Sequence, residues 1–155
     1  MEESSVSLNP REWRSIGALC GVFFLRMLGL FLVLPVLSRY ASSLDGATPL
    51  LIGLAVGAFP LTQTLLQVPF GWLSDWIGRK PIIAGGLLLF AAGSLLAASA
   101  TSIVGLIAGF CLQGAGAIGS VIVALLADLT RDEVRTRAMA MIGGSVGLAL
   151  GVGFV

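Results

Sequence analysis

The chain has 155 residues, of which 57% are hydrophobic and only 11% are charged, and its net charge is +1. A typical soluble domain carries about 25% charged residues, so this chain has too few polar side chains to coat a water-soluble globule. The absence of histidine excludes histidine-based metal sites and proton relays, and the charge balance gives no reason to expect a nucleic-acid partner. A lipid bilayer is therefore the expected partner of most of the surface.

Five apolar segments dominate the chain, and each is near or above the roughly 20 residues needed to cross the hydrocarbon core of a membrane. Within lipid, a helix satisfies its own backbone hydrogen bonds, so we predict an all-α, polytopic transmembrane helical bundle of about five spans. Thr48 and Pro49 suit the cap and the first turn of the second helix, and the polar residues 1–12 are expected to form a short mobile tail. The predicted spans are residues 13–37, 48–74, 81–99, 102–127 and 137–155.

The basic residues indicate how the bundle is oriented. If the N-terminus is cytoplasmic, seven of the nine basic residues fall in cytoplasmic segments and only Arg39 falls on the opposite side. Cytoplasmic loops carry an excess of Lys and Arg, so we predict a multi-pass membrane protein with a cytoplasmic N-terminus. The seven residues are Arg11, Arg14, Arg79, Lys80, Arg131, Arg135 and Arg137.

Several glycines are spaced by four residues, a spacing that lets helix backbones approach closely in lipid. We interpret these glycines as packing positions, although glycine is also simply frequent in membrane helices. They are Gly17 and Gly21, Gly53 and Gly57, Gly105 and Gly109, and Gly143, Gly147 and Gly151.

Four polar side chains lie inside apolar segments and are candidates for a cavity or a substrate contact. A charge at the bilayer centre costs about 2.5–3.5 kcal/mol on insertion scales. Arg26 is therefore expected to face a protein interior or a wet cavity, either as a substrate or anion contact or as a structural arginine bonded to carbonyls and glutamines. Gln63, Gln67 and Gln113 need hydrogen-bond partners, which interhelical hydrogen bonds or a substrate would supply.

The segment 71–81 joins the second and third apolar segments and carries one acid and two bases. Asp75 lies near the C-terminal end of its helix, where the helix dipole disfavours an acid, so a base or the N-terminus of another helix must compensate. Arg79 follows four residues later, and Gly78 is expected to break the helix between them. Asp128 ends the fourth helix on the same side of the membrane. Asp75, Arg79 and Asp128 would form either an interfacial cluster or a solvated surface pair worth at most about 1 kcal/mol.

The pattern Gly71-x-Leu73-x-Asp75-x-x-Gly78-Arg79-Lys80 resembles the loop 2–3 signature of the major facilitator superfamily. Further matching stretches are Arg26-Met27-Leu28-Gly29, Leu34-Pro35, Leu112-Gln113-Gly114-x-Gly116 and Asp128-Leu129-Thr130. The whole chain is similar to the first five helices of a drug–proton antiporter-type transporter, and particularly to the bacterial YajR-like transporters. This resemblance implies a location in the bacterial inner membrane.

The resemblance also implies secondary transport by alternating access, with small-molecule substrates leaving the cell in exchange for protons. Asp75 would meet a helix N-terminus of a second bundle in the outward-facing state, and Arg79 would pair with Asp128 within the first bundle. Arg26, Gln63 and Gln113 would lie near the central cavity or in its supporting shell. The implied conformational lock consists of Gly71, Asp75, Gly78, Arg79, Lys80 and Asp128.

The sequence departs from the family pattern in three ways. Trp76 replaces the base that usually follows the signature aspartate, and Phe110 stands where the family usually has an arginine, three residues before Gln113. The chain also stops before a sixth helix, whereas the family fold has twelve helices in two bundles built from repeats. Residues 1–155 are therefore interpreted as an incomplete, truncated N-terminal bundle, whose partner would be the missing second bundle or another chain.

A second class of function stays open on the sequence alone. The chain could be a non-transporting small membrane protein that acts as a structural or regulatory partner. An enzyme is not expected, because the sequence has no histidine, no credible nucleophile–base pair and no metal cluster. No cofactor and no metal are predicted.

Overall fold

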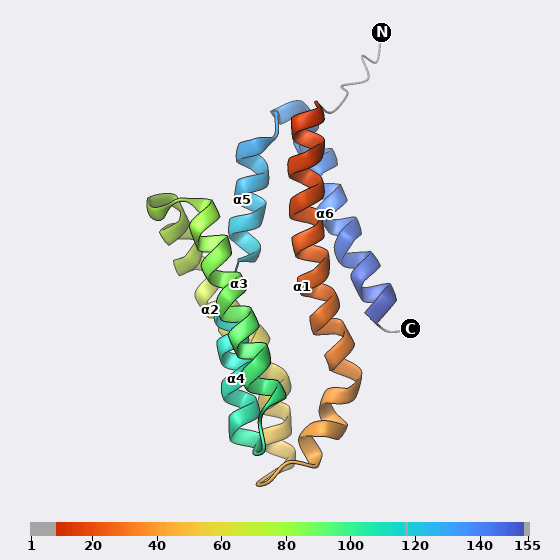
Figure 1. Cartoon of the computed structure of the whole chain (residues 1–155), viewed down its shortest axis with the longest axis vertical. Helices are drawn as coiled ribbons and strands as arrows, with labels where there is room; N and C mark the ends of the chain where they lie inside the picture. Colours follow the sequence, from red (N-terminus) through yellow and green to blue (C-terminus); the bar gives the residue numbers. More distant parts are fainter. Residues whose placement is uncertain (1–8, 117, 154–155) are drawn as a thin grey trace. The chain divides into compact units, whose positions relative to one another are not determined.

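In the computed structural model, residues 9–116 and 118–153 are described. They form helices α1 (Pro10–Ser42), α2 (Pro49–Ile77), α3 (Arg79–Ala98), α4 (Ile103–Ala115), α5 (Gly119–Leu129) and α6 (Asp132–Gly153), shown in Figure 1. The chain divides into two compact units. The first unit comprises the described parts of residues 1–32 and 122–155, and the second unit comprises the described parts of residues 33–121.

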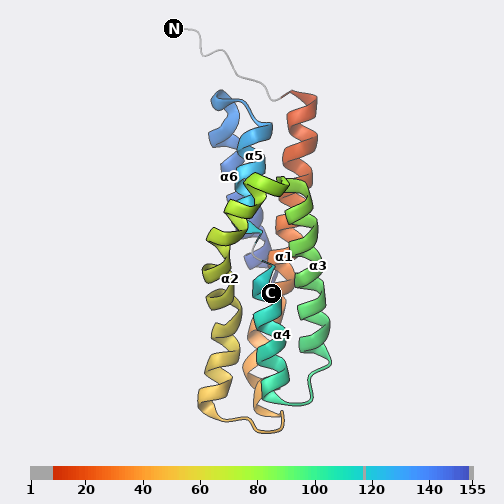
Figure 2. The same ribbon diagram turned by 90° about the vertical axis from the view of Figure 1, so that its left-hand side faces the viewer.

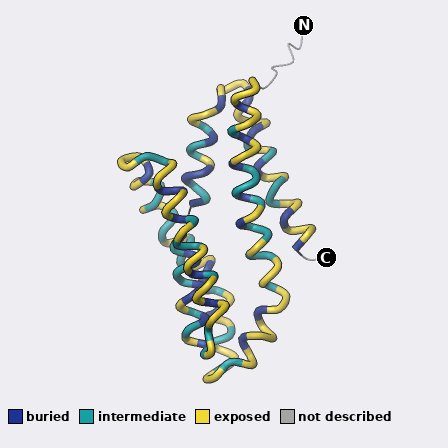
Figure 3. The backbone as a smooth tube through the Cα atoms, in the orientation of Figure 1, coloured by how far each residue is buried: buried dark blue, intermediate teal, exposed yellow. Residues whose placement is uncertain are grey.

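Five stretches of the described helices are long and apolar enough to cross a membrane: α1, α2, α3, α4 together with α5, and α6. Exposed positions recur along all of these helices (Figure 3), and many of them carry large apolar side chains such as Leu50, Val68 and Leu88. An exterior of this composition is suited to lipid, because water would solvate it poorly. The predicted all-α bundle of about five spans is confirmed.

The ends of α2 and α3 follow local sequence signals. Thr48 has extended backbone angles and its hydroxyl accepts a hydrogen bond from the Leu51 backbone N–H at 3.3 Å, so the predicted cap is confirmed. Helix α2 ends at Ile77, and the next residue, Gly78, has a φ of +104°, a conformation that other residues rarely adopt. Helix α3 begins at Arg79, two residues before the predicted start. Pro81 fits within this first turn, because the N–H that proline lacks would have no intrahelical partner there.

The fourth predicted helix, residues 102–127, is interrupted. Helix α4 ends at Ala115 and α5 begins at Gly119, while residue 117 lies outside the described part. The Gly116 N–H donates to the Gln113 carbonyl and the Ile118 N–H donates to the Gly116 carbonyl at 2.8 Å, which replaces the regular helical pattern. A Cβ on Gly116 would lie 2.3 Å from the Gly86 carbonyl oxygen, so the break occurs at a close approach of the α3 backbone.

In the second unit, α2, α3 and α4 pack side by side, with α4 against both neighbours (Figure 2). Glycines allow this packing. A Cβ on Gly93 of α3 would lie 2.3 Å from the Gln113 backbone nitrogen, and one on Gly114 of α4 would lie 2.5 Å from the Phe59 carbonyl oxygen. A Cβ on Gly109 of α4 would likewise lie 2.6 Å from the Ala97 backbone nitrogen. Backbones in contact at these points leave no room for a side chain.

Most of the glycines spaced by four residues are not packing positions within the described chain, so that interpretation was largely wrong. Gly109 is the member that contacts another helix backbone, whereas Gly105 faces only neighbouring residues of its own connection. Close approach is decided by where the helices cross, and spacing alone does not encode the crossing point. Among the described residues, apart from the chain neighbours and the nearby backbone of the same helix, no atom lies within 4 Å of a Cβ placed on Gly17, Gly21, Gly53, Gly57, Gly143, Gly147 or Gly151.

In the first unit, one face of α1 is buried. Its buried positions recur every three or four residues, as an interior helix face requires, and they are Glu12, Ile16, Leu19, Phe23 and Arg26. Helix α6 begins at Asp132, five residues before the predicted start, because Asp132 and Glu133 suit the positive end of the helix dipole. Near its other end, a Cβ on Gly153 would lie 2.6 Å from Phe31 Cβ, so the end of α6 lies close to α1 at this point.

The prediction of a mobile tail over residues 1–12 is wrong for its last residues. Helix α1 begins at Pro10, and Glu12 is buried. The Trp13 N–H donates to the Asn9 carbonyl, and the Asn9 N–H donates to the Glu12 carboxylate at 2.7 Å. Asn9 therefore stands at the cap position and Glu12 closes the first turn, which starts the helix earlier than hydrophobicity alone indicates. Residues 1–8 of the predicted tail lie outside the described part.

Candidate functional site

The turn between α2 and α3 carries a compact group of polar contacts. Arg79 Nη1 lies 3.0 Å from Asp75 Oδ1 and donates a hydrogen bond to Ser74 Oγ at 3.2 Å. The buried Ser74 hydroxyl in turn donates to the Gly71 carbonyl at 2.6 Å. Arg79 is therefore a base that compensates Asp75 at the negative end of α2, and Ser74 is a partner that the sequence pattern did not single out.

The rest of this turn is shaped by backbone contacts. The Gly78 N–H donates to the Ser74 carbonyl at 3.1 Å and ends α2, while Lys80 is exposed in the first turn of α3. One turn earlier in α2, the Ser120 hydroxyl donates to the Gln67 carbonyl at 3.1 Å, and a Cβ on Gly71 would lie 3.6 Å from that hydroxyl. The start of α5 thus packs against α2 near the small Gly71.

Asp128 lies near the end of α5, where it is exposed. It belongs to the first unit, whereas Gly71, Asp75, Gly78, Arg79 and Lys80 belong to the second. The pairing of Arg79 with Asp128 therefore stays a prediction.

The four residues predicted to line a cavity also lie in different units. Gln63, Gln67 and Gln113 belong to the second unit, and Arg26 belongs to the first, where it is 3% exposed. Gln113 Nε2 donates to Ser94 Oγ of α3 at 2.7 Å, which is an interhelical hydrogen bond. Gln113 Oε1 is buried and has no hydrogen-bond partner among the described residues, so only one end of this amide is paired there.

Gln63 and Gln67 are half-buried on α2. Gly114, the residue after Gln113, approaches the α2 backbone so closely that its Cβ would lie 3.2 Å from the Gln63 nitrogen. The structure thus brings Gln63 near the segment that carries Gln113.

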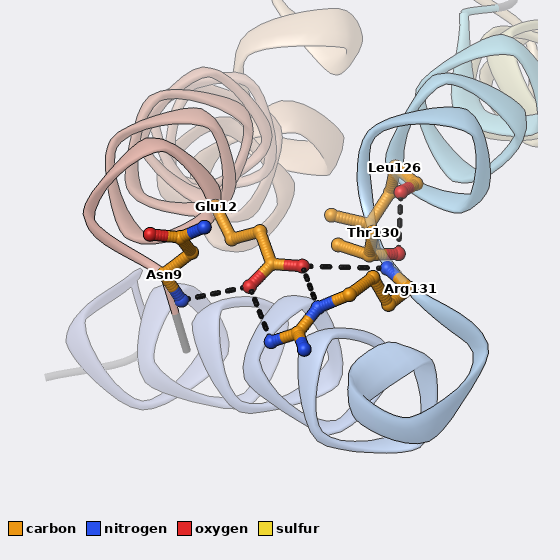
Figure 4. Close-up of polar contacts among 5 residues, drawn as sticks. All are labelled: Asn9, Glu12, Leu126, Thr130 and Arg131. Atoms are coloured by element: carbon orange, nitrogen blue, oxygen red, sulfur yellow. Dashed lines mark hydrogen bonds and ion pairs between the residues drawn. The ribbon is translucent and has the colours of Figure 1, made fainter. Parts of the chain in front are cut away.

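A charged pair in the first unit was missed from the sequence. The Glu12 carboxylate and Arg131 face each other across the space between the first turn of α1 and the α5–α6 turn (Figure 4). Arg131 Nε donates to Glu12 Oε1 at 3.0 Å and Nη2 donates to Oε2 at 3.2 Å. The Arg131 side chain is half exposed, and its hydrogen bond to Glu12 raises the pKa of the guanidinium above its usual value.

A sequence signal for half of this pair was present. Asn9-Pro10-x-Glu12 combines a capping residue, a proline in the first turn and an acid at the third position, which together mark a helix start. The partner of Glu12, more than one hundred residues away, has no comparable local signal. Arg131 was recognised only as one more cytoplasmic base.

The chemistry available to these residues is ion pairing and hydrogen bonding. Among residues 9–116 and 118–153, no group of three or more His, Cys, Asp or Glu side chains is placed to hold a metal ion. Cys20 and Cys111 are free thiols.

Comparison with known proteins agrees with this description. Residues 19–155 match the family model of the Major Facilitator Superfamily. The inner membrane transport protein YajR of Escherichia coli K12 is 54% identical over 148 residues, which cover 96% of this chain and 33% of that protein. An uncharacterized transporter of Buchnera aphidicola subsp. Schizaphis graminum is 54% identical over 81% of this chain and 32% of its own length. The multidrug resistance protein MdtH of Aeromonas salmonicida is 36% identical over 81% of this chain and 34% of its own length.

The chain thus spans about a third of the length of these relatives. Its match to the family model covers most of α1, the other four apolar helical stretches and the polar turn between α2 and α3. The chain belongs to the Major Facilitator Superfamily.

Proposed function

We propose that the chain forms part of a secondary transporter that works by alternating access and exports small molecules in exchange for protons. Its place would be the bacterial inner membrane, with the N-terminus in the cytoplasm. The observation that carries the proposal is the α2–α3 turn, where the signature residues fold into a helix break with Arg79 held by Asp75 and Ser74. The relatives, which are named as transporters, support it.

In this proposal, residues 1–155 are the incomplete N-terminal bundle, and a further bundle or another chain supplies the opposite wall of the cavity. Gly71, Asp75, Gly78, Arg79, Lys80 and Asp128 act as the conformational lock. Asp75 is the exposed member of its ion pair, with 58% of its side chain accessible, so it is available to a group outside the α2–α3 turn. Arg26, Gln63, Gln67 and Gln113 contribute to the cavity or its shell.

Alternating access can be tested without knowing the substrate. Residues 1–155 would replace the matching third of the E. coli relative, with Cys20 and Cys111 changed to serine and a single cysteine placed at Gln67. A membrane-impermeant maleimide would be applied to each face of the membrane in turn, under proton gradients of opposite direction. We expect labelling from one face to rise as labelling from the other falls. A parallel variant would carry the single cysteine at Gln63 instead. Labelling that does not change with the direction of the gradient in either variant would contradict alternating access.

The lock is tested in the same protein by Asp75→Asn. The change removes the charge that compensates Arg79 but keeps the side-chain volume, so we expect normal insertion and a roughly tenfold slower exchange between the two labelling states, the scale of one charge-assisted hydrogen bond. Asp132→Asn, which removes another exposed surface acid, is the control. Exchange rates that are equal in the Asp75→Asn and unmodified proteins would remove the role assigned to the turn.

Orientation requires its own measurement. A reporter that is active only in the cytoplasm, fused to residue 1, should be active, and a cysteine replacing the exposed Ser43 should be labelled from the periplasmic face. The opposite result would invert the topology and remove the lock from the cytoplasmic surface.

A further inference from the structure

We propose that Glu12 is a positioning residue for Asp128, and that it acts through Arg131 by holding the end of α5 against the first turn of α1. The inference rests on the proposed function, in which Asp128 is an acid of the conformational lock. It assigns a role to a residue outside the recognised signature of the α2–α3 turn.

The Glu12 carboxylate is fully engaged by hydrogen-bond donors. Oε2 accepts from the Asn9 N–H at 2.7 Å and from Arg131 Nη2 at 3.2 Å. Oε1 accepts from Arg131 Nε at 3.0 Å and from the Arg131 backbone N–H at 3.4 Å. Glu12 is only 7% exposed, so these contacts replace most of its water. Both the side chain and the backbone of Arg131 are thereby fixed to α1 (Figure 4).

The segment that carries Asp128 is held from two sides. The buried Thr130 hydroxyl donates to the Leu126 carbonyl at 2.7 Å and tightens the end of α5. Arg131, the next residue, is bound to Glu12. Asp128 lies on the backbone between these anchors and is exposed, so a shift of this backbone moves Asp128 with it.

A simpler role for Glu12 is to cap α1 through Asn9, and the two roles can be separated. Glu12→Gln keeps a side-chain oxygen that can accept from the Asn9 N–H, but it loses the charge and turns an amide NH₂ toward the donors of Arg131. Arg131→Gln removes the same pair from the other side and leaves the α1 cap intact. Asp132→Asn, which removes the adjacent exposed pair with Arg135, is the matched control.

The first measurement reports on the segment itself. The chain would be placed in lipid nanodiscs with Cys20 and Cys111 changed to serine and a spin label on a cysteine at Leu129, which is partly exposed beside Asp128. We expect Glu12→Gln, Arg131→Gln and the double variant to increase the label's mobility to the same extent, because all three remove one interaction. Arg131→Lys, which keeps the charge but cannot make the two-donor contact, should restore part of the immobile signal.

The second measurement connects the pair to the lock. In the chimeric protein used for the labelling experiment, Glu12→Gln and Arg131→Gln should each slow exchange between the two labelling states about threefold to tenfold, within the range of a charged hydrogen bond. In an Asp128→Asn background, neither change should slow exchange further. This dependence on Asp128 would not arise from a merely structural effect of Glu12 on α1.

The outcomes distinguish this inference from the proposed function. Unchanged label mobility in Glu12→Gln and Arg131→Gln would overturn the positioning role, whatever the transport experiments show. Increased mobility with unchanged exchange, or full effects that persist in the Asp128→Asn background, would also overturn it. A chimera with no alternating labelling would remove the proposed function, and with it the lock on which the role of Glu12 depends.

Discussion

Different kinds of contact hold together the helices inside each of the two units. In the second unit, α4 meets α2 and α3 backbone to backbone, at positions such as Gly93 and Gly114 where a single added carbon would lie within 2.5 Å of a neighbouring main-chain atom. In the first unit, the end of α6 approaches α1 where Gly153 faces Phe31, and the first turn of α1 joins the α5–α6 turn through Glu12 and Arg131.

From this difference we infer which part of each unit is rigid and which part is adjustable. Backbone contacts of van der Waals type lose much of their attraction when they separate by even 0.5–1 Å, so the second unit is expected to move as one piece. The end of the first unit is instead held by the Glu12–Arg131 ion pair, whose arginine side chain is 53% exposed and can exchange the carboxylate for water or another charged group. We therefore expect the end of the first unit, near Asp128, to be the adjustable part.

The largest expected effect comes from filling a backbone contact in the second unit. Gly93→Ala places a methyl group against the Gln113 backbone, and overpacking of this kind costs about 1–3 kcal/mol. The higher helix propensity of alanine offsets at most about 1 kcal/mol of this loss. Unfolding in mixed detergent micelles would measure the change. Gly57→Ala, where nothing lies within 4 Å, should not destabilise the protein, and equal effects at both positions would refute the packing argument.

A smaller effect is expected from the polar contact within the same unit. Ser94→Ala removes the acceptor of Gln113 Nε2 and should destabilise the protein by about 1 kcal/mol, because a buried donor is left unpaired. The double variant Ser94→Ala/Gln113→Leu should recover part of this loss, since it removes the buried amide altogether. The same unfolding assay tests both variants. A double variant less stable than Ser94→Ala would show that the amide contributes in another way.

In the first unit, Thr130→Val removes a buried hydroxyl and keeps the side-chain shape. The lost hydrogen bond to the Leu126 carbonyl should reduce stability by about 0.5–1 kcal/mol, because the carbonyl retains its helical partner. The spin label at residue 129 should become more mobile. Thr64→Val, whose hydroxyl donates to the Pro60 carbonyl at an exposed site, provides the control and should leave stability nearly unchanged.

The smallest effect is expected from the exposed pair of Asp132 and Arg135, which lie 2.7 Å apart on the first turn of α6. Asp132→Asn should change stability by no more than about 0.5 kcal/mol, because exposed ion pairs are well solvated. Raising the salt concentration should leave even less difference between the two proteins. A loss of more than about 1 kcal/mol would mean that this turn is more rigid than its exposure indicates.

Much of the fold follows from the sequence because its signals are local. Hydrophobic length identifies the five spans, Thr48 and Pro49 mark the start of α2, and Gly78 marks its end. The break between α4 and α5 was not predicted, because it depends on where Gly86 of α3 meets Gly116. The packing glycines were misjudged for the same reason, since a crossing point is a property of two helices.

The candidate site was only partly accessible from the sequence. The spacing of Asp75 and Arg79 indicated that they could share a charge network, and they form an ion pair. The link between Glu12 and Arg131 joins residues from distant parts of the chain, and nothing near either residue specifies the other. The interhelical partner of Gln113, Ser94 of α3, was hidden for the same reason.

In the second unit, the α1–α2 connection and the α3–α4 connection are joined by hydrogen bonds to main-chain groups. The Asp45 N–H donates to the Thr101 carbonyl, the Ile103 N–H donates to the Asp45 carbonyl, and the Tyr40 hydroxyl donates to the Ala100 carbonyl. The α1–α2 connection is made by the ribosome long before its partner between α3 and α4. During synthesis, the polar groups of the α1–α2 connection must therefore hydrogen-bond to water at first. They exchange this water for their partners once the later helices have entered the membrane and the α3–α4 connection has formed.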